Sequence, residues 1–168
     1  DNFYIADAGN NRVLYYPAGS TTATRVYGQG GSFSTNELNK VVSENSLNSP
    51  NAVAVDSHGN LYIADSGDNR VLYYPAGSTT ATRVYGQGGD FTTSNGDVSG
   101  TSLNTPDGVT LDSHDNLYIV DSANNRVLYY PAGSTTATRV YGQDGDFTAN
   151  VSTVSATGLS IPVGITLD

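Results

Sequence analysis

The chain has 168 residues, a net charge of −9 and no cysteine, and 37% of its residues are hydrophobic. The acidity argues against a phosphate-gripping surface for nucleic acid, and the lack of cysteine excludes disulfides, thiolate metal sites and thiol nucleophiles. No apolar run approaches the roughly 20 residues that a membrane-spanning helix needs.

The string NRVLYYPAGSTTATRVYGQ occurs three times without a change, at residues 11–29, 69–87 and 125–143. The copies start 58 and then 56 residues apart, so nearly the whole chain is one unit written three times. Fixed periods of this size are typical of propellers, solenoids or arrays. The 19 glycines and 12 tyrosines fit an all-β member of this group.

Strands are predicted in chain order from runs of Val, Ile, Tyr and Thr that Gly, Asn, Asp, Ser and Pro punctuate. The first unit has strands at 2–7, 11–17 and 23–29, and a long loop at 30–49. The second has strands at 51–56, 60–65, 69–75 and 81–87, and a loop at 88–105. The third has strands at 107–112, 116–121, 125–131 and 137–143, a loop at 144–161, and a last strand-like stretch at 163–168.

Each full unit is predicted to be a four-stranded antiparallel meander, because the connections inside it are short. In the third strand Val71 and Tyr73 point to one face and Leu72 and Tyr74 to the other, so both faces are apolar and a sheet must pack on each side. The first strand carries small residues, and the outer strands carry tyrosines. This gradient in side-chain size fits sheets that converge at their first strands and splay apart at their outer strands. We therefore predict an all-β fold, a β-propeller of four-stranded antiparallel blades, with three blades per chain forming half of a six-bladed ring.

The run P-x-x-V-x-x-D-S-x-G-N-L-Y-I-A-D-S-x-x-N-R-V resembles the NHL repeat, whose propellers usually have six blades. The resemblance covers all three units and agrees in position and spacing through each blade. The long connection between the fourth strand and the next first strand departs from the short form of that family, and it carries a G-Q-x-G-x-F signature.

The whole chain, 1–168, is predicted to be one propeller segment. Its repeats span about 1–50, 51–106 and 107–162; the first lacks its innermost strand, and 163–168 is a spare innermost strand. We expect this spare strand to complete a blade of another copy, giving a homodimer that closes a six-bladed ring, or a longer array or fibre. The alternative is that further repeats of a longer chain supply the missing blades.

Three Asp–Arg pairs bracket the turn from the second to the third strand of each blade. An Asp at such a turn accepts backbone N–H groups, and an Arg five residues later can pair with it or with the next blade. We predict that these pairs lock the blades structurally: Asp7 with Arg12, Asp65 with Arg70, and Asp121 with Arg126.

The long loops are the parts that differ between the copies, and loops on a rigid scaffold are where recognition usually lies. They are polar and would lie on one face of the disc. The predicted binding residues are Phe33, Asn36, Asp90, Phe91, Asn95, Asp97, Asp144, Asp146, Phe147 and Asn150. Asn150 also begins a glycosylation sequon, which has meaning only in a secretory eukaryote.

Metal or catalytic roles have four weak candidates, namely His58, His114, Asp144 and Asp146. The two histidines occupy equivalent turns between first and second strands, and we expect Ser-His-Gly-Asn to make a tight polar turn there. Ser113, His114 and Asp115 are adjacent in the chain and do not make a catalytic triad. The D-G-D sequence of the third loop attracts calcium but lacks the full calcium-loop spacing, so we predict no cofactor, with calcium as the one alternative.

The predicted function is a non-catalytic binding or structural scaffold, extracellular or on the cell surface, with a cytoplasmic location left open. Its loop face would contact a protein, peptide or glycan, and the chain would not be an enzyme. The alternative is a metal-dependent enzyme of the lyase or lactonase kind that some NHL-like propellers resemble, with its site in the central channel. RNA recognition, a third possibility, needs a basic aromatic face that the net charge argues against.

Overall fold

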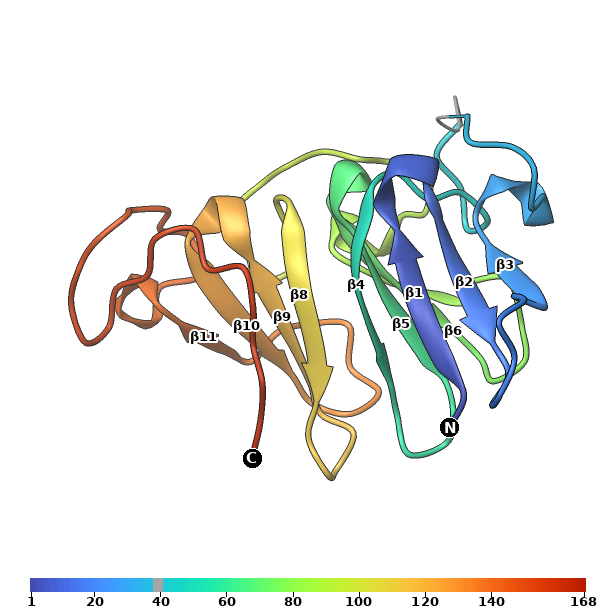
Figure 1. The fold of residues 1–168 in the computed structure, drawn as a ribbon. Coiled ribbons are helices and arrows are strands. Elements are labelled where there is room, and N and C mark those ends of the chain that lie inside the picture. Colours follow the sequence, from blue (N-terminus) through green and yellow to red (C-terminus); the bar gives the residue numbers. More distant parts are fainter. Residues whose placement is uncertain (38–40) are drawn as a thin grey trace.

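The chain folds into three antiparallel sheets that stand side by side, and the computed structural model describes residues 1–37 and 41–168 (Figure 1). The first sheet has three strands, β1 (Phe3–Asp7), β2 (Arg12–Tyr16) and β3 (Arg25–Tyr27). The second has four, β4 (Pro50–Val55), β5 (Leu61–Asp65), β6 (Arg70–Tyr74) and β7 (Arg83–Tyr85). The third has four, β8 (Pro106–Leu111), β9 (Leu117–Asp121), β10 (Arg126–Tyr130) and β11 (Arg139–Tyr141).

Each sheet is a meander in which neighbours in the chain are neighbours in the sheet. The register is the same in each blade: Asp65 lies opposite Arg70, and Leu61 opposite Tyr74. The connections from the second to the third strand are single 3-10 turns, Ala8–Asn10, Ser66–Asp68 and Ser122–Asn124. The predicted all-β fold of antiparallel blades is confirmed.

The fourth strand of each blade has three residues instead of the predicted seven. The glycine that follows it ends the strand, because its backbone has a positive φ that strands do not use; Gly86, for example, has φ 85° and ψ −179°. A second short 3-10 turn then begins each long loop, at Gln29–Gly31, Gln87–Gly89 and Gln143–Gly145.

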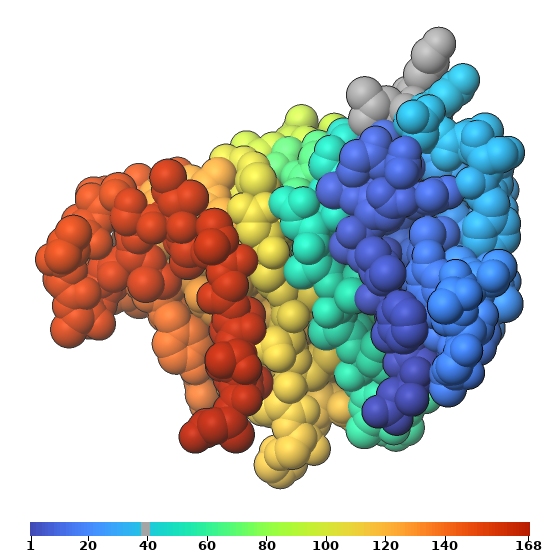
Figure 2. All heavy atoms as spheres, viewed as in Figure 1, coloured from blue at the N-terminus to red at the C-terminus, as the bar shows by residue number. Residues whose placement is uncertain are grey.

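Residues 163–168 pair with no strand of the described chain, although the sequence predicts a strand there. Figure 2 shows the end of the chain running beside β8, and the carbonyl of Val163 lies next to Gly108. The segment therefore lies where an inner strand would lie, and it pairs with no strand among residues 1–37 and 41–168.

The core lies between the blades. One cluster joins the first and second sheets through Val13, Tyr27, Ile63 and Tyr74. The second cluster repeats this contact between the second and third sheets. Tyrosine rings meet edge to face at each contact, Tyr27 with Tyr74 at 5.1 Å and Tyr85 with Tyr130 at 5.3 Å between ring centroids.

The two leucines at the ends of the long loops, Leu47 and Leu103, are completely buried in these two clusters. Each loop thus wedges an apolar side chain between the blade it leaves and the blade it enters. Loop and blades consequently share one core.

Candidate functional site

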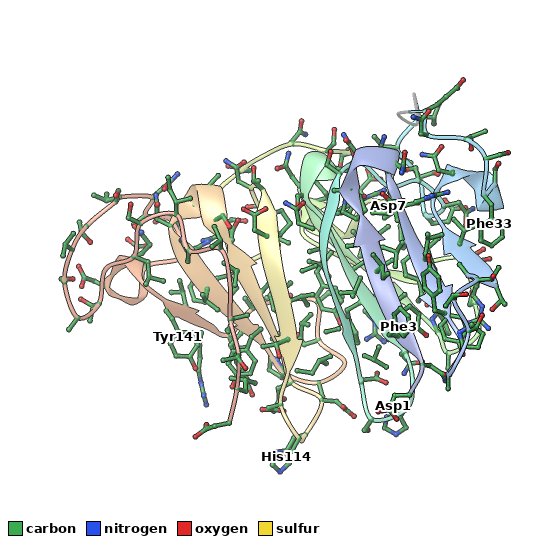
Figure 3. The ribbon with its side chains drawn as sticks, in the orientation of Figure 1. Asp1, Phe3, Asp7, Phe33, His114 and Tyr141 are labelled. Atoms are coloured by element: carbon green, nitrogen blue, oxygen red, sulfur yellow. The ribbon has the colours of Figure 1, made fainter. Side chains whose placement is uncertain are left out.

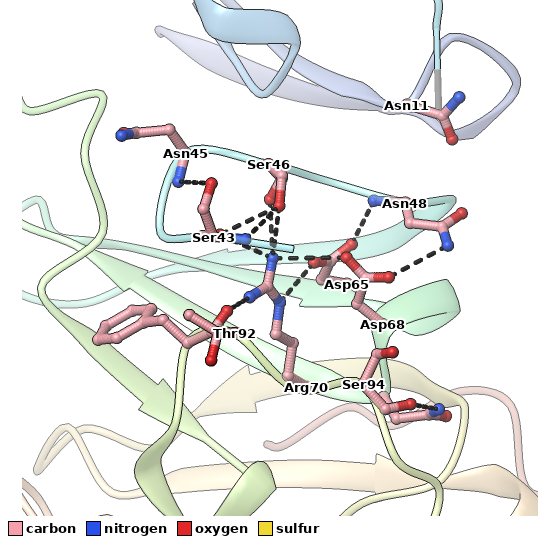
Figure 4. Close-up of polar contacts among 12 residues, drawn as sticks. Asn11, Ser43, Asn45, Ser46, Asn48, Asp65, Asp68, Arg70, Thr92 and Ser94 are labelled. Carbon is pink, nitrogen blue, oxygen red and sulfur yellow. Dashed lines mark hydrogen bonds and ion pairs between the residues drawn. The ribbon is translucent and has the colours of Figure 1, made fainter. Parts of the chain in front are cut away.

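The end of the blades where the long loops lie is organised around a buried arginine (Figure 4). Arg70 begins β6, and its Nε donates a hydrogen bond of 2.8 Å to Asp65 at the end of β5. Its Nη2 donates to the carbonyls of Ser43 and Ser46, both at 3.0 Å, in the loop that arrives from the first blade. Its Nη1 donates at 2.7 Å to the carbonyl of Phe91 in the loop that leaves.

One guanidinium therefore ties two consecutive loops to the blade between them. Asp65 completes the set, because it accepts a 2.6 Å hydrogen bond from the backbone of Asn48. Both side chains of the Asp65–Arg70 pair are fully buried. Burial raises the pKa of Asp65 to about 7, and the charge of Arg70 opposes that rise.

The third blade repeats this arrangement. Arg126 donates to Asp121 at 2.7 Å, to Phe147 at 2.6 Å, and to Ser99 and Ser102 in the preceding loop. Burial raises the pKa of Asp121 as well. In the first blade Arg12 bonds Asp7 at 2.7 Å and the carbonyl of Phe33 at 2.6 Å, and its side chain is partly exposed.

The predicted binding residues of the loops carry many of the contacts that hold the loops in place. The phenylalanines give their carbonyls to the arginines, and two of them, Phe91 and Phe147, also pack against the core, while Phe33 is exposed. The carbonyls of Asn36 and Asp97 accept amide hydrogens from the 3-10 turn regions.

Asn95 exchanges two hydrogen bonds with Gln87, and Asn150 bonds Asn125 and the carbonyl of Ala123. Asn95 thus bonds within its own loop, whereas Asn150 connects its loop to the turn between β9 and β10. Eight of the ten residues that the sequence singled out are exposed, and the other two, Phe91 and Phe147, are half-buried.

The acidic residues of the loops turn toward their own backbone. Asp90 and Asp146 each accept the N–H and hydroxyl of the threonine two residues on, at 2.7 Å. Asp144 instead accepts the hydroxyl of Thr157. Asp144 and Asp146 thus have different partners.

A second polar cluster lies at the opposite end of the blades, where the inner strand turns into the next strand. Asp56 shapes this turn by accepting the N–H groups of His58 and Asn60, both at 2.9 Å. Asp112 does the same in the third blade. Figure 3 labels His114 at the tip of the β8–β9 turn, which is the equivalent of His58 at the tip of the β4–β5 turn.

The two turns meet through Asp115. Its carboxylate accepts the hydroxyl of Ser57 at 2.6 Å and the backbone N–H of Ser57 at 2.9 Å, and it lies 3.3 Å from Nδ1 of His58. Hydrogen bonds from Ser57 hold the pKa of Asp115 below its usual range. The structure thus joins His58 to a residue 57 positions away, a contact that the sequence analysis missed.

This cluster has the parts of a histidine–carboxylate dyad. The carboxylate lies on the Nδ1 side of the ring, and 77% of the His58 side chain is exposed, so Nε2 is open to a ligand. Ser57 is no nucleophile here, because its hydroxyl donates to Asp115 and its Oγ contacts Nδ1 of His58, not Nε2.

A metal finds no ready ligand set in the described residues, 1–37 and 41–168. No three His, Asp or Glu side chains come together there, and neither histidine meets Asp144 or Asp146.

Comparison with known proteins identifies the repeat. Residues 47–74 and 103–130 match the family model of the NHL repeat. The predicted resemblance is therefore confirmed for the second and third units. No curated protein matches the chain in sequence.

Two similar solved structures are lyases. The chain is 14% identical to a protein described as streptogramin B lyase, with a TM-score of 0.53; the match covers 83% of this chain and 36% of that one. Virginiamycin B lyase from Staphylococcus aureus is also 14% identical, with a TM-score of 0.47 and coverage of 82% and 36%. The chain thus spans about a third of the length of these proteins, and the likeness shows a shared fold.

The first of these structures corrects the function expected from the sequence. The predictions of a non-catalytic scaffold and of a chain that is not an enzyme are wrong, because the similar structure is that of an enzyme and favours the alternative of an NHL-like propeller enzyme. The inner strands are built of small residues, whereas the turns at their ends carry the contact between His58 and Asp115. In the described part of the chain no helix is long and apolar enough to cross a membrane.

Proposed function

We propose that this chain, whose second and third units match the NHL repeat, forms part of a lyase-type enzyme whose general base is His58. The base lies at the end of the inner strands, beside one mouth of the central channel that propeller blades surround. The contact between His58 and Asp115 carries this proposal.

The geometry suits proton abstraction. A carboxylate beside one ring nitrogen of a histidine fixes the tautomer in which the other nitrogen is free to accept a proton, and it stabilises the imidazolium that follows. The backbone N–H groups of His58 and Asn60 donate to Asp56, and these hydrogen bonds fix the backbone of the turn that carries His58. The exposure of the ring leaves room for a substrate to approach Nε2.

The reaction that we propose is an elimination. His58 takes a proton from a carbon, the electron pair forms a C=C bond with the neighbouring carbon, and the C–O bond of the leaving group breaks. In a cyclic ester this opens the ring without water, whereas a lactonase adds one water molecule. A lyase and a lactonase are thus distinguished by the mass of the product.

Mass spectrometry of the product tests the activity. The purified chain is incubated with streptogramin B, the compound in the name of the similar enzyme, and with simpler cyclic esters. We expect an open-ring product of unchanged mass with a new absorbance from the conjugated double bond. A product heavier by one water, or no turnover of any cyclic ester, would contradict a lyase.

Substitutions at the dyad locate the base. His58→Gln is expected to lower turnover by about 10²–10⁴-fold, the usual contribution of a general base. Asp115→Gly removes the carboxylate and leaves the turn intact, because the second blade carries Gly59 at this position and both residues have positive φ. We expect Asp115→Gly to melt like the parent and to lose turnover.

The matched control is Asp107→Asn, at the opposite end of β8. Asp107 accepts a 2.6 Å hydrogen bond from Asn51 of the neighbouring inner strand, so it contacts the adjacent blade much as Asp115 does. This variant should keep its activity. Equal losses in Asp107→Asn and Asp115→Gly would show that contacts between inner strands, and not the dyad, matter.

Calcium binding and location are separate proposals. We propose that the third loop, where Asp144 and Asp146 lie two residues apart, binds calcium. Calorimetric titration of the parent and of Asp146→Asn with calcium checks this, and equal heats in both would refute it.

We also propose an extracellular or cell-surface location. Antibody labelling of intact source cells tests this location.

A further inference from the structure

The second long loop, 88–105, contains the single Asn–Gly pair of the sequence, Asn95–Gly96, and both residues are exposed. In such a pair the backbone nitrogen of the glycine can attack the side-chain amide carbon of the asparagine, because glycine has no Cβ atom to hinder the approach. The attack needs a free side chain on the asparagine and a free backbone N–H on the glycine. The contacts of the loop decide whether both are free.

The backbone of Asn95 is held by the side chain of Gln87. The Nε2 atom of Gln87 donates a hydrogen bond of 2.7 Å to the carbonyl of Asn95, and the backbone N–H of Asn95 donates at 2.8 Å to Oε1 of Gln87. Nε2 of Gln87 also donates at 2.9 Å to the carbonyl of Asn69, at the end of the β5–β6 turn. One side-chain amide therefore holds both backbone groups of Asn95.

The side chain of Asn95 and the backbone N–H of Gly96 take part in no hydrogen bond among residues 1–37 and 41–168. The third blade shows that the loop does not need this side chain. Val151 stands at the same place there, and Gln143 makes the same two hydrogen bonds with its backbone, at 2.7 and 2.8 Å. The amide of Asn95 is therefore free to turn toward the nitrogen of Gly96.

We propose that Asn95 is a deamidation site, at which water converts the side-chain amide into a carboxylate without the help of an enzyme. The nitrogen of Gly96 forms a bond to Cγ of Asn95, the bond between Cγ and Nδ2 breaks, and ammonia leaves with the proton of the Gly96 N–H. The cyclic imide then takes up one water molecule. Opening at Cγ gives aspartate, and opening at the backbone carbonyl gives isoaspartate. This site does not depend on the proposed activity.

The isoaspartate product disturbs the contact with Gln87. Its backbone has one more carbon between the N–H and the carbonyl of residue 95, so a single side-chain amide cannot keep both hydrogen bonds at the distances that such bonds need. The product also adds a negative charge two residues before Asp97, in a chain whose net charge is already −9. We therefore expect isoaspartate to loosen the second long loop.

Peptide mass spectrometry of the stored protein tests the site. The purified chain is kept warm at mildly alkaline pH, and samples are digested over time. We expect the peptide that carries Asn95–Gly96 to gain about 1 Da, because an amide becomes a carboxyl, before any other asparagine peptide does. Electron-transfer fragmentation should show both aspartate and isoaspartate at residue 95. A constant mass of this peptide, or an earlier change at another asparagine, would overturn the proposal.

Two substitutions that copy the third blade test the chemistry. Asn95→Val removes the reactive amide, and it should melt like the parent because Val151 makes the same backbone bonds. Its peptide should keep its mass. Gly96→Ser places the residue type of Ser152 beside the intact asparagine, and we expect it to slow the mass change several-fold. Equal rates in Gly96→Ser and the parent would exclude attack by the nitrogen of residue 96 as the slow step.

Limited proteolysis tests the loosening of the loop. The stored parent should be cut within 88–105 faster than the fresh parent, because a loop that has lost its ties opens more often. Freshly made Asn95→Asp is the matched control, since it carries the new charge on an ordinary backbone, and it should be cut as slowly as the fresh parent. Cleavage of fresh Asn95→Asp as fast as that of the stored parent would refute the role of the extra backbone carbon.

Discussion

Arg70→Met is expected to lower the free energy of unfolding by about 3–5 kcal/mol, the cost of breaking a buried ion pair by removing one partner. The substitution leaves Asp65 buried without its cation, and it leaves the carbonyls of Ser43, Ser46 and Phe91 without their donor. Two loops lose their tie to the blade at once. Urea denaturation followed by circular dichroism measures the change.

Arg83→Met is the matched control. Arg83 lies in the same sheet and stacks on the ring of Tyr73 at 4.7 Å, a partly exposed cation–π contact worth about 0.5–1 kcal/mol. A double variant, Arg70→Met with Asp65→Leu, should recover much of the loss, because it removes the unpaired charge as well. Equal losses at Arg70 and Arg83 would refute the locking role of the buried arginine.

The pH dependence of the stability of the Arg70→Met variant tests the same role of Arg70. Burial raises the pKa of Asp65, and in the variant the opposing charge of Arg70 is gone, so the pKa rises further. A carboxyl whose pKa is higher in the folded than in the unfolded state binds more protons when folded, so stability falls as pH rises above about 4. The deficit of Arg70→Met relative to the parent should therefore be smaller at pH 5 than at pH 8.

The sequence predicted the blades because the signals for them are local. Alternating apolar residues in Val71–Tyr74 set two buried faces, and the short connections leave only a meander. The spacing of Asp65 and Arg70 places them opposite each other across β5 and β6, as the register shows. The spacing could not predict the other three partners of Arg70, since these are loop carbonyls whose position depends on the packing of Leu47 and Phe91.

The candidate site was missed because its contact is between blades. Ser57 and Asp115 come together only through the angle between two blades, which no local pattern encodes. A signal for it does exist: the turn reads S-H-G-N in the second blade and S-H-D-N in the third. A glycine at a left-handed position replaced by aspartate is a change that turn geometry does not require, and it marks a side chain with another task.

Some of the predicted binding residues of the loops also hold the loops in place, which the variation between copies did not indicate. Asn150 bonds Asn125 of the third blade, and Phe147 packs against the core. Loops of this length that cross between blades need internal ties for their backbone groups, and polar side chains supply them. Variation therefore reports which residues can satisfy a loop as well as which residues can recognise a ligand.

Gly86→Ala is expected to cost about 2–4 kcal/mol, because strain and a clash add. Gly86 has φ 85° and ψ −179°, a conformation that is open almost only to glycine. A Cβ atom there would lie 3.0 Å from the carbonyl oxygen of Asn69 and 3.2 Å from Leu103. That carbonyl also accepts a hydrogen bond from Gln87, so it cannot move freely.

Gly88→Asp is the matched control for Gly86→Ala. It tests whether the turn rejects any side chain or only one that clashes as a side chain at Gly86 would. Gly88 also has positive φ, at 60°, but nothing lies within 4 Å of a Cβ atom there. The third blade carries Asp144 at this position with φ 51°. Gly88→Asp should therefore change the free energy of unfolding by less than about 1 kcal/mol. Equal urea midpoints of the two variants would contradict this explanation. The glycine after each fourth strand would then not be required by its close approach to the carbonyl of Asn69.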